Sequence, residues 1–313
     1  MIPLDSKILI TGANGLVGTA LIEELQNQGY SNLILLTRNL CDLRNFDAVK
    51  SFFFETEPNI VFHTAAAVFG IGGNLKNRGS IFLDNILVNT HVIEASRLAK
   101  VKKIIAMGTV AAYPETGKSP IRETQIWEGP PHGSESSYGH AKRAMLAQLL
   151  AYQENYGLDF AYVISTNLYG PRDKFDSEYG HVIPSLIRKF YEAKKEGRAV
   201  TIWGDGTASR DFLYSKDMAR ALLAIMQEFT GPINVATGFE KKIKDVVTVL
   251  TDYFDMQGNV FWDAQKPNGR KFSPLDLRAL NNLRFAPSFT LEQGLKETLD
   301  WFSSNYEQMA IRY

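Results

Sequence analysis

Thr11-Gly12-Ala13-Asn14-Gly15-Leu16-Val17-Gly18 is the stretch of this 313-residue chain that decides its fold. It follows a short apolar run, residues 7–11, and opens a segment whose apolar residues recur at helical spacing. Glycines at a strand-to-helix turn let the backbone approach a pyrophosphate, and the unpaired N–H groups of the helix attract its charge. The predicted contacts to a dinucleotide are Gly12, Asn14, Gly15, Leu16, Val17 and Gly18.

Strand and helix patterns alternate on either side of this turn. Short, continuous apolar runs are typical of parallel strands that are buried on both faces. The runs lie at 7–11, 33–37, 60–63, 103–107 and 160–164, and helical patterns lie at 82–100 and 138–156. This alternation predicts an α/β fold with a doubly wound parallel sheet, the Rossmann arrangement, over residues 1–170.

The rhythm changes after Pro171. The sequence predicts a loop at 172–180, helices at 182–193, 244–254 and 291–306, a strand at 200–203 and a loop at Pro267-Asn268-Gly269. We expect residues 171–313 to form a smaller substrate-binding lobe over the carboxyl edge of the sheet, with part of 209–240 returning to the first domain. Ligands bind at that edge in doubly wound folds.

Composition excludes several classes of function. The chain has 34 Lys+Arg against 34 Asp+Glu, so it lacks the basic excess that nucleic-acid binders and anionic-lipid binders show. It has no apolar run of about 20 residues, which a membrane span needs. Its single cysteine, Cys41, cannot form an internal disulfide, which indicates a cytoplasmic protein with no multi-cysteine metal site.

The end of the second strand indicates which nicotinamide cofactor binds. An acidic residue there bonds the ribose 2′-hydroxyl of NAD, whereas a basic residue accepts the 2′-phosphate of NADP. The sequence gives Arg38, which predicts NADP(H); the alternative is a solvated surface arginine. Asp42 and Leu43 are expected at the adenine. Ala65 and Ala66 follow the third strand, where small side chains let the backbone lie against the cofactor.

A tyrosine and a lysine provide candidate chemistry. Tyr138 and Lys142 share one face of a helix because they lie four residues apart. A nearby ammonium is expected to lower the tyrosine pKa, so that Tyr138 exchanges a proton with a sugar oxygen while Lys142 also holds the nicotinamide ribose. Thr109, just past the fourth strand, can bond the same oxygen. The alternative is a helix with a partly buried tyrosine and an exposed lysine.

Several longer motifs resemble the extended short-chain dehydrogenase/reductase family and, within it, the GDP-L-fucose synthase branch. They read STNLYGP at 165–171, GHVIPSLIR at 180–188, IWGDGT at 202–207, RDFLY at 210–214 and KPNG at 266–269. The resemblance runs nearly end to end. It implies NADPH-dependent reduction of a 4-keto-6-deoxy GDP-hexose after epimerisation at C3 and C5, and a two-fold homodimer.

The resemblance also implies roles for particular residues. The catalytic residues it implies are Thr109, Tyr138 and Lys142, with His181 as acid, base or substrate ligand. The substrate contacts it implies are Thr109, Asn167, His181, Arg188, Trp203, Arg210 and Lys266. Trp203 offers an aromatic face for a nucleobase, and Arg210 a forked guanidinium for the diphosphate. The alternatives are a core tryptophan and a surface ion pair between Arg210 and Asp211.

One position departs from the family pattern. After the fourth strand the family has Gly-Ser-Ser-Cys-x-Tyr-Pro, and its cysteine is the epimerisation base; this chain has Ala111 in its place. Alanine carries no proton, and proton abstraction next to a carbonyl needs a titratable group. The sequence therefore predicts a 4-ketoreductase that has kept the hydride chemistry and has lost or reduced epimerase activity. The alternatives are the full epimerase/reductase, a nucleotide-sugar 4-epimerase or dehydrogenase, and a cofactor-binding protein without activity.

Overall fold

A six-stranded parallel sheet forms the centre of the computed structural model, which describes residues 2–115, 118–176, 180–266 and 272–309. The strand order is β10-β5-β4-β3-β1-β2. The strands are β1 (Ile8–Thr11), β2 (Leu33–Leu36), β3 (Ile60–His63), β4 (Lys103–Met107), β5 (Asp159–Ser165) and β10 (Gly231–Val235). Because β1 pairs with β2 on one side and β3 on the other, the strand order reverses there, and the predicted doubly wound sheet is confirmed.

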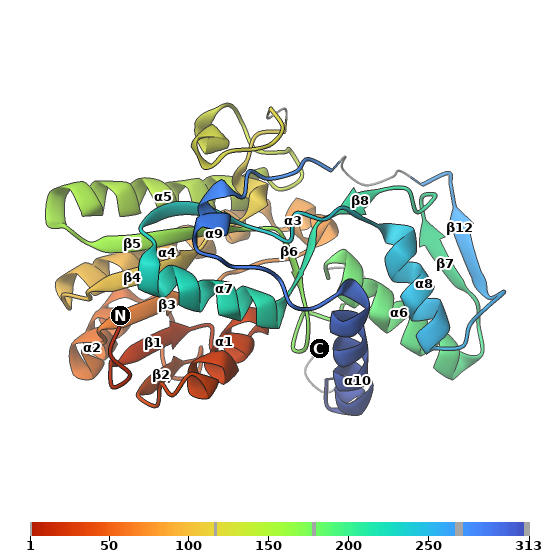
Figure 1. Cartoon of the computed structure of the whole chain (residues 1–313), viewed down its shortest axis with the longest axis horizontal. Coiled ribbons are helices and arrows are strands. Elements are labelled where there is room, and N and C mark those ends of the chain that lie inside the picture. Colours follow the sequence, from red (N-terminus) through yellow and green to blue (C-terminus); the bar gives the residue numbers. More distant parts are fainter. Residues whose placement is uncertain (1, 116–117, 177–179, 267–271, 310–313) are drawn as a thin grey trace.

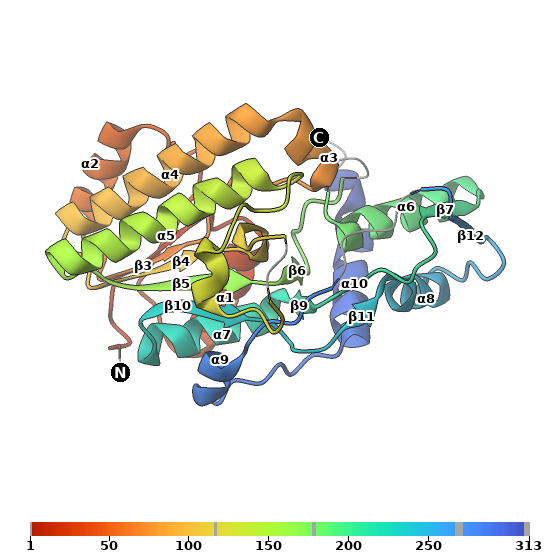
Figure 2. The ribbon, with the colours of Figure 1, turned by 90° about the horizontal axis from the view of Figure 1, so that it is seen from above.

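Helices cover both faces of the sheet, which is why its strands are continuous apolar runs (Figures 1 and 2). Every residue of β1, β3 and β4 is buried. One face carries α2 (Phe46–Thr56), α4 (Arg78–Leu98) and α5 (Ser136–Tyr156). The other face carries α1 (Leu16–Asn27) and α7 (Ser215–Glu228), which contact each other.

The helix boundaries differ slightly from those expected. The helix predicted at 82–100 begins earlier, at Arg78, and the helix predicted at 138–156 begins at Ser136. Four helices were not predicted: α2, the short α3 (Ile71–Lys76), α7 and the short α9 (Arg278–Asn282). The α2 segment contains three consecutive phenylalanines, Phe52, Phe53 and Phe54, of which only Phe53 is buried. Consecutive apolar residues do not show the 3.6-residue spacing by which a helix is recognised in a sequence.

A second hydrophobic core lies beside the sheet, at the right of Figure 1. Its elements are α6 (Val182–Glu196), β7 (Val200–Trp203), α8 (Ile243–Tyr253), β12 (Val260–Asp263) and α10 (Leu291–Met309). Aromatic rings fill it: the Phe175 and Phe302 rings lie 4.6 Å apart, and Phe190 stacks on Phe254 at 6.2 Å. Strand β12 pairs in parallel with β7. The predicted loop at Pro267-Asn268-Gly269 lies outside the described residues.

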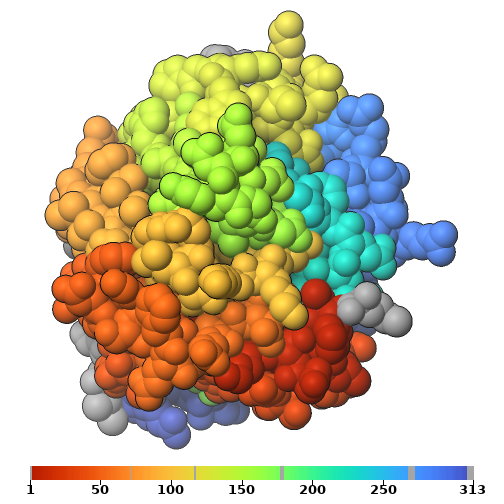
Figure 3. Space-filling model, turned by 90° about the vertical axis from the view of Figure 1, so that its left-hand side faces the viewer, coloured from red at the N-terminus to blue at the C-terminus, as the bar shows by residue number. Residues whose placement is uncertain are grey.

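Short strand pairs connect this core to the sheet. Strand β6 (Asn167–Tyr169) pairs with β9 (Phe212–Tyr214), and β8 (Ser209–Arg210) pairs with β11 (Lys241–Lys242). From β9 the chain runs through α7 into β10, beside β5. Figure 3 shows the end of the molecule at which the cyan segment of α7 and β10 lies against the red and green parts of the first half of the chain. No helix within the described ranges is long and apolar enough to cross a membrane.

Asn234 of the edge strand β10 ties three loops to the sheet. Its fully buried side chain donates hydrogen bonds to the carbonyls of Ile121, at 2.9 Å, and Asp276, at 3.1 Å. It accepts one from the Tyr113 hydroxyl at 2.6 Å. Its backbone N–H donates to Glu123 at 2.9 Å. An asparagine is needed here because the site combines carbonyl acceptors with a hydroxyl donor.

We expect Asn234→Ala to lower the free energy of unfolding by about 2–4 kcal/mol, because the buried Tyr113 hydroxyl and two carbonyls lose their partner. Urea unfolding measures the change. Asn281→Ala, an exposed position of α9 (Arg278–Asn282), is the matched control and is expected to stay within about 0.5 kcal/mol of the wild type. Equal stabilities of the two variants contradict this role for Asn234.

Candidate active site

The turn between β1 and α1 has the shape of a phosphate cradle. Gly12 has φ +70°, and a Cβ there would lie 2.9 Å from the Ala65 nitrogen. A Cβ on Gly18 would lie 2.3 Å from the Gly12 carbonyl oxygen, so α1 approaches the turn only with glycine there. The N-cap of α1, Gly15, provides no side-chain cap, and the first turn of the helix holds no acidic residue. This helix end therefore fits an anionic ligand.

A buried chain of hydrogen bonds joins the end of β1, just before the glycine turn, to β3 and α4. The His63 ring bonds Thr11 Oγ1 through Nδ1 at 2.9 Å and Asn89 Oδ1 through Nε2 at 3.0 Å. Thr11 Oγ1 also accepts a hydrogen bond from the Ala65 N–H at 3.2 Å. The amide oxygen of Asn89 only accepts, so Nε2 carries the ring proton and Nδ1 accepts from Thr11. Burial, aided by the Lys142 charge, lowers the pKa of His63 to about 3, so the ring is neutral.

Two arginines, Arg38 and Arg44, lie in the segment between β2 and α2. Arg38 is exposed. Exposure agrees both with the predicted 2′-phosphate ligand and with the alternative of a solvated surface arginine, so it does not distinguish them. Asp42 is engaged by Arg44, whose Nη2 lies 2.8 Å from its carboxylate and helps to lower its pKa to about 2. Leu43 is buried, and its carbonyl bonds the His91 ring at 3.0 Å. Arg44, a further cation near this edge, was not singled out from the sequence.

Tyr138 and Lys142 lie in the first two turns of α5, and both are buried. The Lys142 ammonium donates to the Met107 carbonyl at 2.8 Å and lies 5.8 Å from the centroid of the Tyr138 ring. Burial lowers the pKa of Lys142 to about 7, and burial together with Glu135 raises the pKa of Tyr138. The prediction that the ammonium lowers the tyrosine pKa is therefore wrong for this structure, in which Lys142 bonds the strand, and burial and Glu135 raise the pKa of Tyr138.

Glycine lets α5 approach the segment after β4. A Cβ on Gly139 would lie 2.5 Å from the Ala111 carbonyl oxygen. Ala111 and Tyr138 consequently pack together with Ile81 in a small apolar cluster, which Ala66 and Phe69 complete. Thr109 caps the short helix η1 (Val110–Ala112) by accepting from the Ala111 N–H at 3.2 Å, which leaves its hydroxyl proton for another acceptor.

The predicted substrate residues have different environments. Trp203, at the end of β7, is 68% exposed, and the Lys266 ammonium lies 5.7 Å from its ring centroid. The expected alternative of a core tryptophan is therefore wrong. Arg210 Nη1 donates to the carbonyl of Ser209. Asp211 accepts from Thr237 and Gly238, at 2.9 Å and 2.7 Å, and thereby holds the loop after β10.

Two other predicted substrate residues, Asn167 of β6 and Arg188 of α6, make hydrogen bonds within the protein. Asn167 Nδ2 donates to the carbonyl of Asp211 at 3.2 Å. Arg188 pairs with Glu192 at 2.7 Å and donates through Nη1 to the carbonyl of Phe175 at 3.1 Å.

His181 is exposed at the N-cap of α6. The protein atoms packed around the imidazole remove water from its charged form, and this desolvation, together with the Lys174 charge, lowers the pKa of His181. Sequence reasoning missed Lys174, and it missed the adjoining Asp173, whose Oδ2 is buried without a hydrogen-bond partner among the described residues. Burial raises the pKa of Asp173 to about 7. No motif marks either residue, because both lie in a stretch that reads as a loop.

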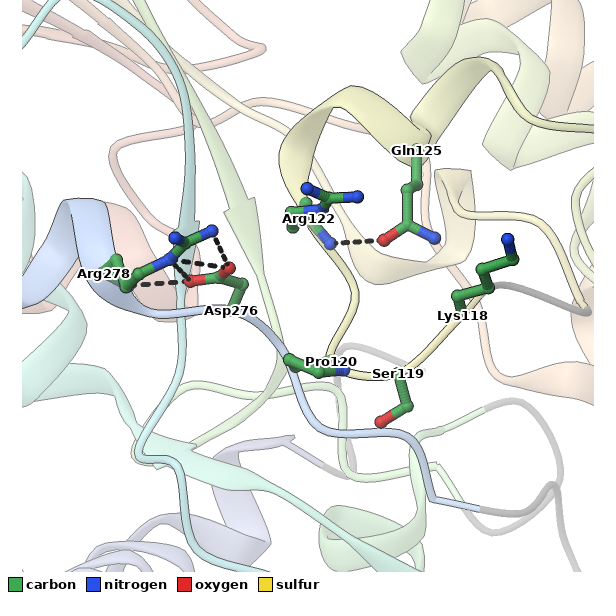
Figure 4. Close-up of a pocket in the computed structure, with 7 residues that line it drawn as sticks. All are labelled: Lys118, Ser119, Pro120, Arg122, Gln125, Asp276 and Arg278. Carbon is green, nitrogen blue, oxygen red and sulfur yellow. Dashed lines mark hydrogen bonds and ion pairs between the residues drawn. The ribbon is translucent and has the colours of Figure 1, made fainter.

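A surface depression of about 470 Å³ lies elsewhere (Figure 4). Its lining residues are Lys118, Ser119, Pro120, Arg122, Gln125, Asp276 and Arg278. Arg278 and Asp276, which both line it, form an ion pair at 2.7 Å (Figure 4). None of the predicted site residues lines it, so we place the chemistry at the carboxyl edge of the sheet and not here.

The fold, the glycine turn and the Tyr–Lys pair on α5 define an oxidoreductase of the extended short-chain dehydrogenase/reductase class. The model of the NAD dependent epimerase/dehydratase family matches residues 8–236. The chain belongs to this family.

Relatives within the family are similar along almost their whole length. The chain is 33% identical to the GDP-L-fucose synthase of Escherichia coli K12, over 96% of this chain and 98% of that protein. A GDP-L-fucose synthetase from Naegleria fowleri bound to NADP superposes with a TM-score of 0.91 at 34% identity, over 98% and 95% of the two chains. A GDP-mannoheptose C4 reductase from Campylobacter jejuni with NADP bound gives 0.86 at 31%, over 97% and 100%.

His63 gives the folded protein a specific acid sensitivity. The unfolded chain takes up a proton on His63 near pH 6.5, whereas the folded chain resists until about pH 3. Stability therefore falls as the pH drops below about 6.5, by up to about 1.4 kcal/mol per pH unit from this residue. We expect His63→Gln to be less stable than the wild type at pH 7.5 and to lose less stability on acidification to pH 4.5.

Urea unfolding at a series of pH values measures this difference. His140→Gln, which removes an exposed histidine of α5, is the control and is expected to keep the wild-type slope. Parallel pH profiles for His63→Gln and the wild type would mean that His63 is not the group held neutral.

Proposed function

We propose that this protein reduces the 4-keto group of a GDP-linked 4-keto-6-deoxy sugar with NADPH and has lost epimerase activity. The observation that carries the proposal is Tyr138, buried beside Ala111 and sharing its helix face with Lys142. The relatives are named as GDP-sugar synthases and reductases, which supports the nucleotide-sugar substrate.

The residues of the glycine turn fit NADP(H). We propose that the N–H groups at the start of α1 bind the pyrophosphate and that Arg38 binds the 2′-phosphate. Asp42 and Leu43 would lie at the adenine, and Ala65 and Ala66 along the cofactor; the relatives with NADP bound support this assignment. NADPH, when bound, supplies the hydride.

Tyr138 would supply the proton. As the carbonyl carbon is reduced, its oxygen gains negative charge and takes the phenolic proton, which gives the alcohol. The Thr109 hydroxyl would bond the same oxygen. Lys142, drawn from the Met107 carbonyl toward the nicotinamide ribose, would stabilise the phenolate that remains. A lysine with a pKa of about 7 is charged in only part of the molecules at neutral pH, so ligand oxygens around it would favour the charged form.

The second core would bind the nucleotide. The exposed face of Trp203 suits a base, and Lys266 beside it adds a positive charge for the phosphates. We propose Arg210, Arg188 and Asn167 as diphosphate or sugar ligands. Arg188 Nη2 donates no hydrogen bond to any residue within the described ranges, so a phosphate can bind there without breaking the pair with Glu192. His181 would bind the sugar.

Ala111 is the reason to propose that epimerisation is lost. Its side chain carries no proton, and it packs in one cluster with Tyr138, whose own proton is needed for the reduction. The full 3,5-epimerase/4-reductase is the second candidate, because the curated relatives are named GDP-L-fucose synthases. His181 would then have to supply the missing acid or base.

We further propose a cytoplasmic homodimer that associates through α4 and α5, as the family resemblance implies. These helices contact each other and expose Phe82, Leu83 and Leu150. A two-fold contact through α4 and α5 would remove these apolar side chains from water. The substrate-binding lobe is proposed to span 171–313, except for the part of 209–240 that joins the sheet.

We expect Tyr138→Phe to lower kcat for NADPH oxidation by about 10²–10⁴-fold with a GDP-4-keto-6-deoxy sugar, because the proton donor is gone. The Kd for NADPH, measured by fluorescence titration, is expected to change less than about twofold. Tyr156→Phe, an exposed tyrosine at the end of the same helix, is the control and keeps wild-type turnover. Undiminished turnover in Tyr138→Phe refutes the proposed chemistry.

The loss of epimerase activity is tested in deuterated water without NADPH. We expect NMR of GDP-4-keto-6-deoxymannose to show no enzyme-dependent deuterium uptake at C3 or C5, because no base replaces the cysteine. The E. coli relative is the positive control. Ala111→Cys is expected to exchange faster than the wild type. Rapid uptake at both carbons with the wild type favours the full epimerase/reductase instead.

A further inference from the structure

Lys174 lies over Phe69, at one side of the small apolar cluster that contains Ala111 and Tyr138, although it comes from a distant part of the chain. It follows β6 in the loop that precedes α6. Its ammonium sits 3.8 Å from the centroid of the Phe69 ring, over the ring face. Phe69 in turn packs against the cluster that contains Ala111 and Tyr138. A positive charge from the second half of the chain is thus held over the Phe69 side of the cluster that includes Tyr138.

The Lys174 ammonium has hydrogen-bonding capacity to spare. Within the part of the chain that the structure describes, no residue accepts a hydrogen bond from its Nζ. The ammonium makes a cation–π contact with the ring of Phe69. Partial burial lowers the pKa of Lys174, and Asp176 partly opposes this. A half-buried ammonium with three N–H donors and an aromatic ring on one side is suited to bind a ligand oxygen on the other.

We propose that Lys174 binds an oxygen atom of the sugar part of the nucleotide sugar and is a specificity residue for that sugar. This inference rests on the proposed function, because Tyr138 must reach a sugar oxygen for the reduction. Tyr138 and Phe69 belong to the same small apolar cluster, so a sugar whose carbonyl oxygen reaches Tyr138 can extend another oxygen toward the ammonium above Phe69. The cofactor phosphates belong instead at the glycine turn, where Gly12 faces Ala65.

The same ammonium acts on His181. Its charge helps to hold the pKa of His181 below the usual value, which keeps the imidazole neutral. A neutral imidazole both donates and accepts hydrogen bonds, as a sugar ligand requires, but it has no proton to give as an acid at neutral pH. Lys174 and His181 together therefore suit recognition of hydroxyl and carbonyl oxygens better than proton transfer to carbon.

Binding without turnover tests this role. Titration calorimetry of the NADP⁺-saturated protein measures Kd for GDP-mannose, which carries the sugar, and for GDP, which lacks it. We expect Lys174→Met to raise the Kd for GDP-mannose about tenfold, the loss typical of a hydrogen bond from a charged group. The Kd for GDP is expected to stay within about twofold, because Lys174 does not touch the nucleotide.

Lys50→Met, on the exposed side of α2, is the matched control and is expected to leave both Kd values unchanged. Three results overturn the proposal: an unchanged Kd for GDP-mannose in Lys174→Met, equal weakening of GDP and GDP-mannose, or a raised Kd for NADP⁺. Failure of the wild type to bind GDP-mannose overturns it as well. A wild type that binds GDP-mannose but reduces no keto sugar refutes the proposed reaction and leaves this binding test standing.

Discussion

The hydrogen-bond chain Asn89–His63–Thr11–Ala65 is the constraint on which the site depends. It joins α4, the end of β3, the end of β1 and the segment after β3 beneath the glycine turn. Gly12 lies against Ala65 with no room for a side chain, so the turn keeps its shape only while these segments stay in register. The chain is satisfied by a neutral imidazole, because a protonated ring has no acceptor in the lone pair of Nδ1. Burial of His63 thus fixes both a charge state and a geometry.

Much of the fold follows from local sequence. Buried parallel strands such as Ile60–His63 and Lys103–Met107 are continuous apolar runs, and their bounds are as expected. The strand β10 (Gly231–Val235) and the helix α2 (Phe46–Thr56) were not located, for different reasons. Strand β10 begins Gly-Pro and contains Asn234, a polar residue whose partners come from distant loops. Its place is decided by tertiary hydrogen bonds, which a local pattern does not contain.

The site is only partly readable from sequence. Spacing places Tyr138 and Lys142 on one helix face, but it does not reveal that the lysine bonds the Met107 carbonyl and that burial governs both pKa values. Motif resemblance points to Arg188, and the structure adds the pair with Glu192 that orients it. Lys174 carries no motif at all. Its position depends on the path of a loop between two cores, and the contact with Phe69 joins residues 105 positions apart in the chain.

The order in which the chain visits the sheet has a consequence for its assembly. The sixth strand, β10, is reached only after the chain has passed through α6 and β7 of the other core, and each of its residues pairs with a residue of β5 70 positions earlier. When the first five strands have been synthesised, the β5 edge of the sheet still lacks its neighbour, and the face under α7 still lacks its cover. No single cut of the chain therefore separates the completed sheet from the second core.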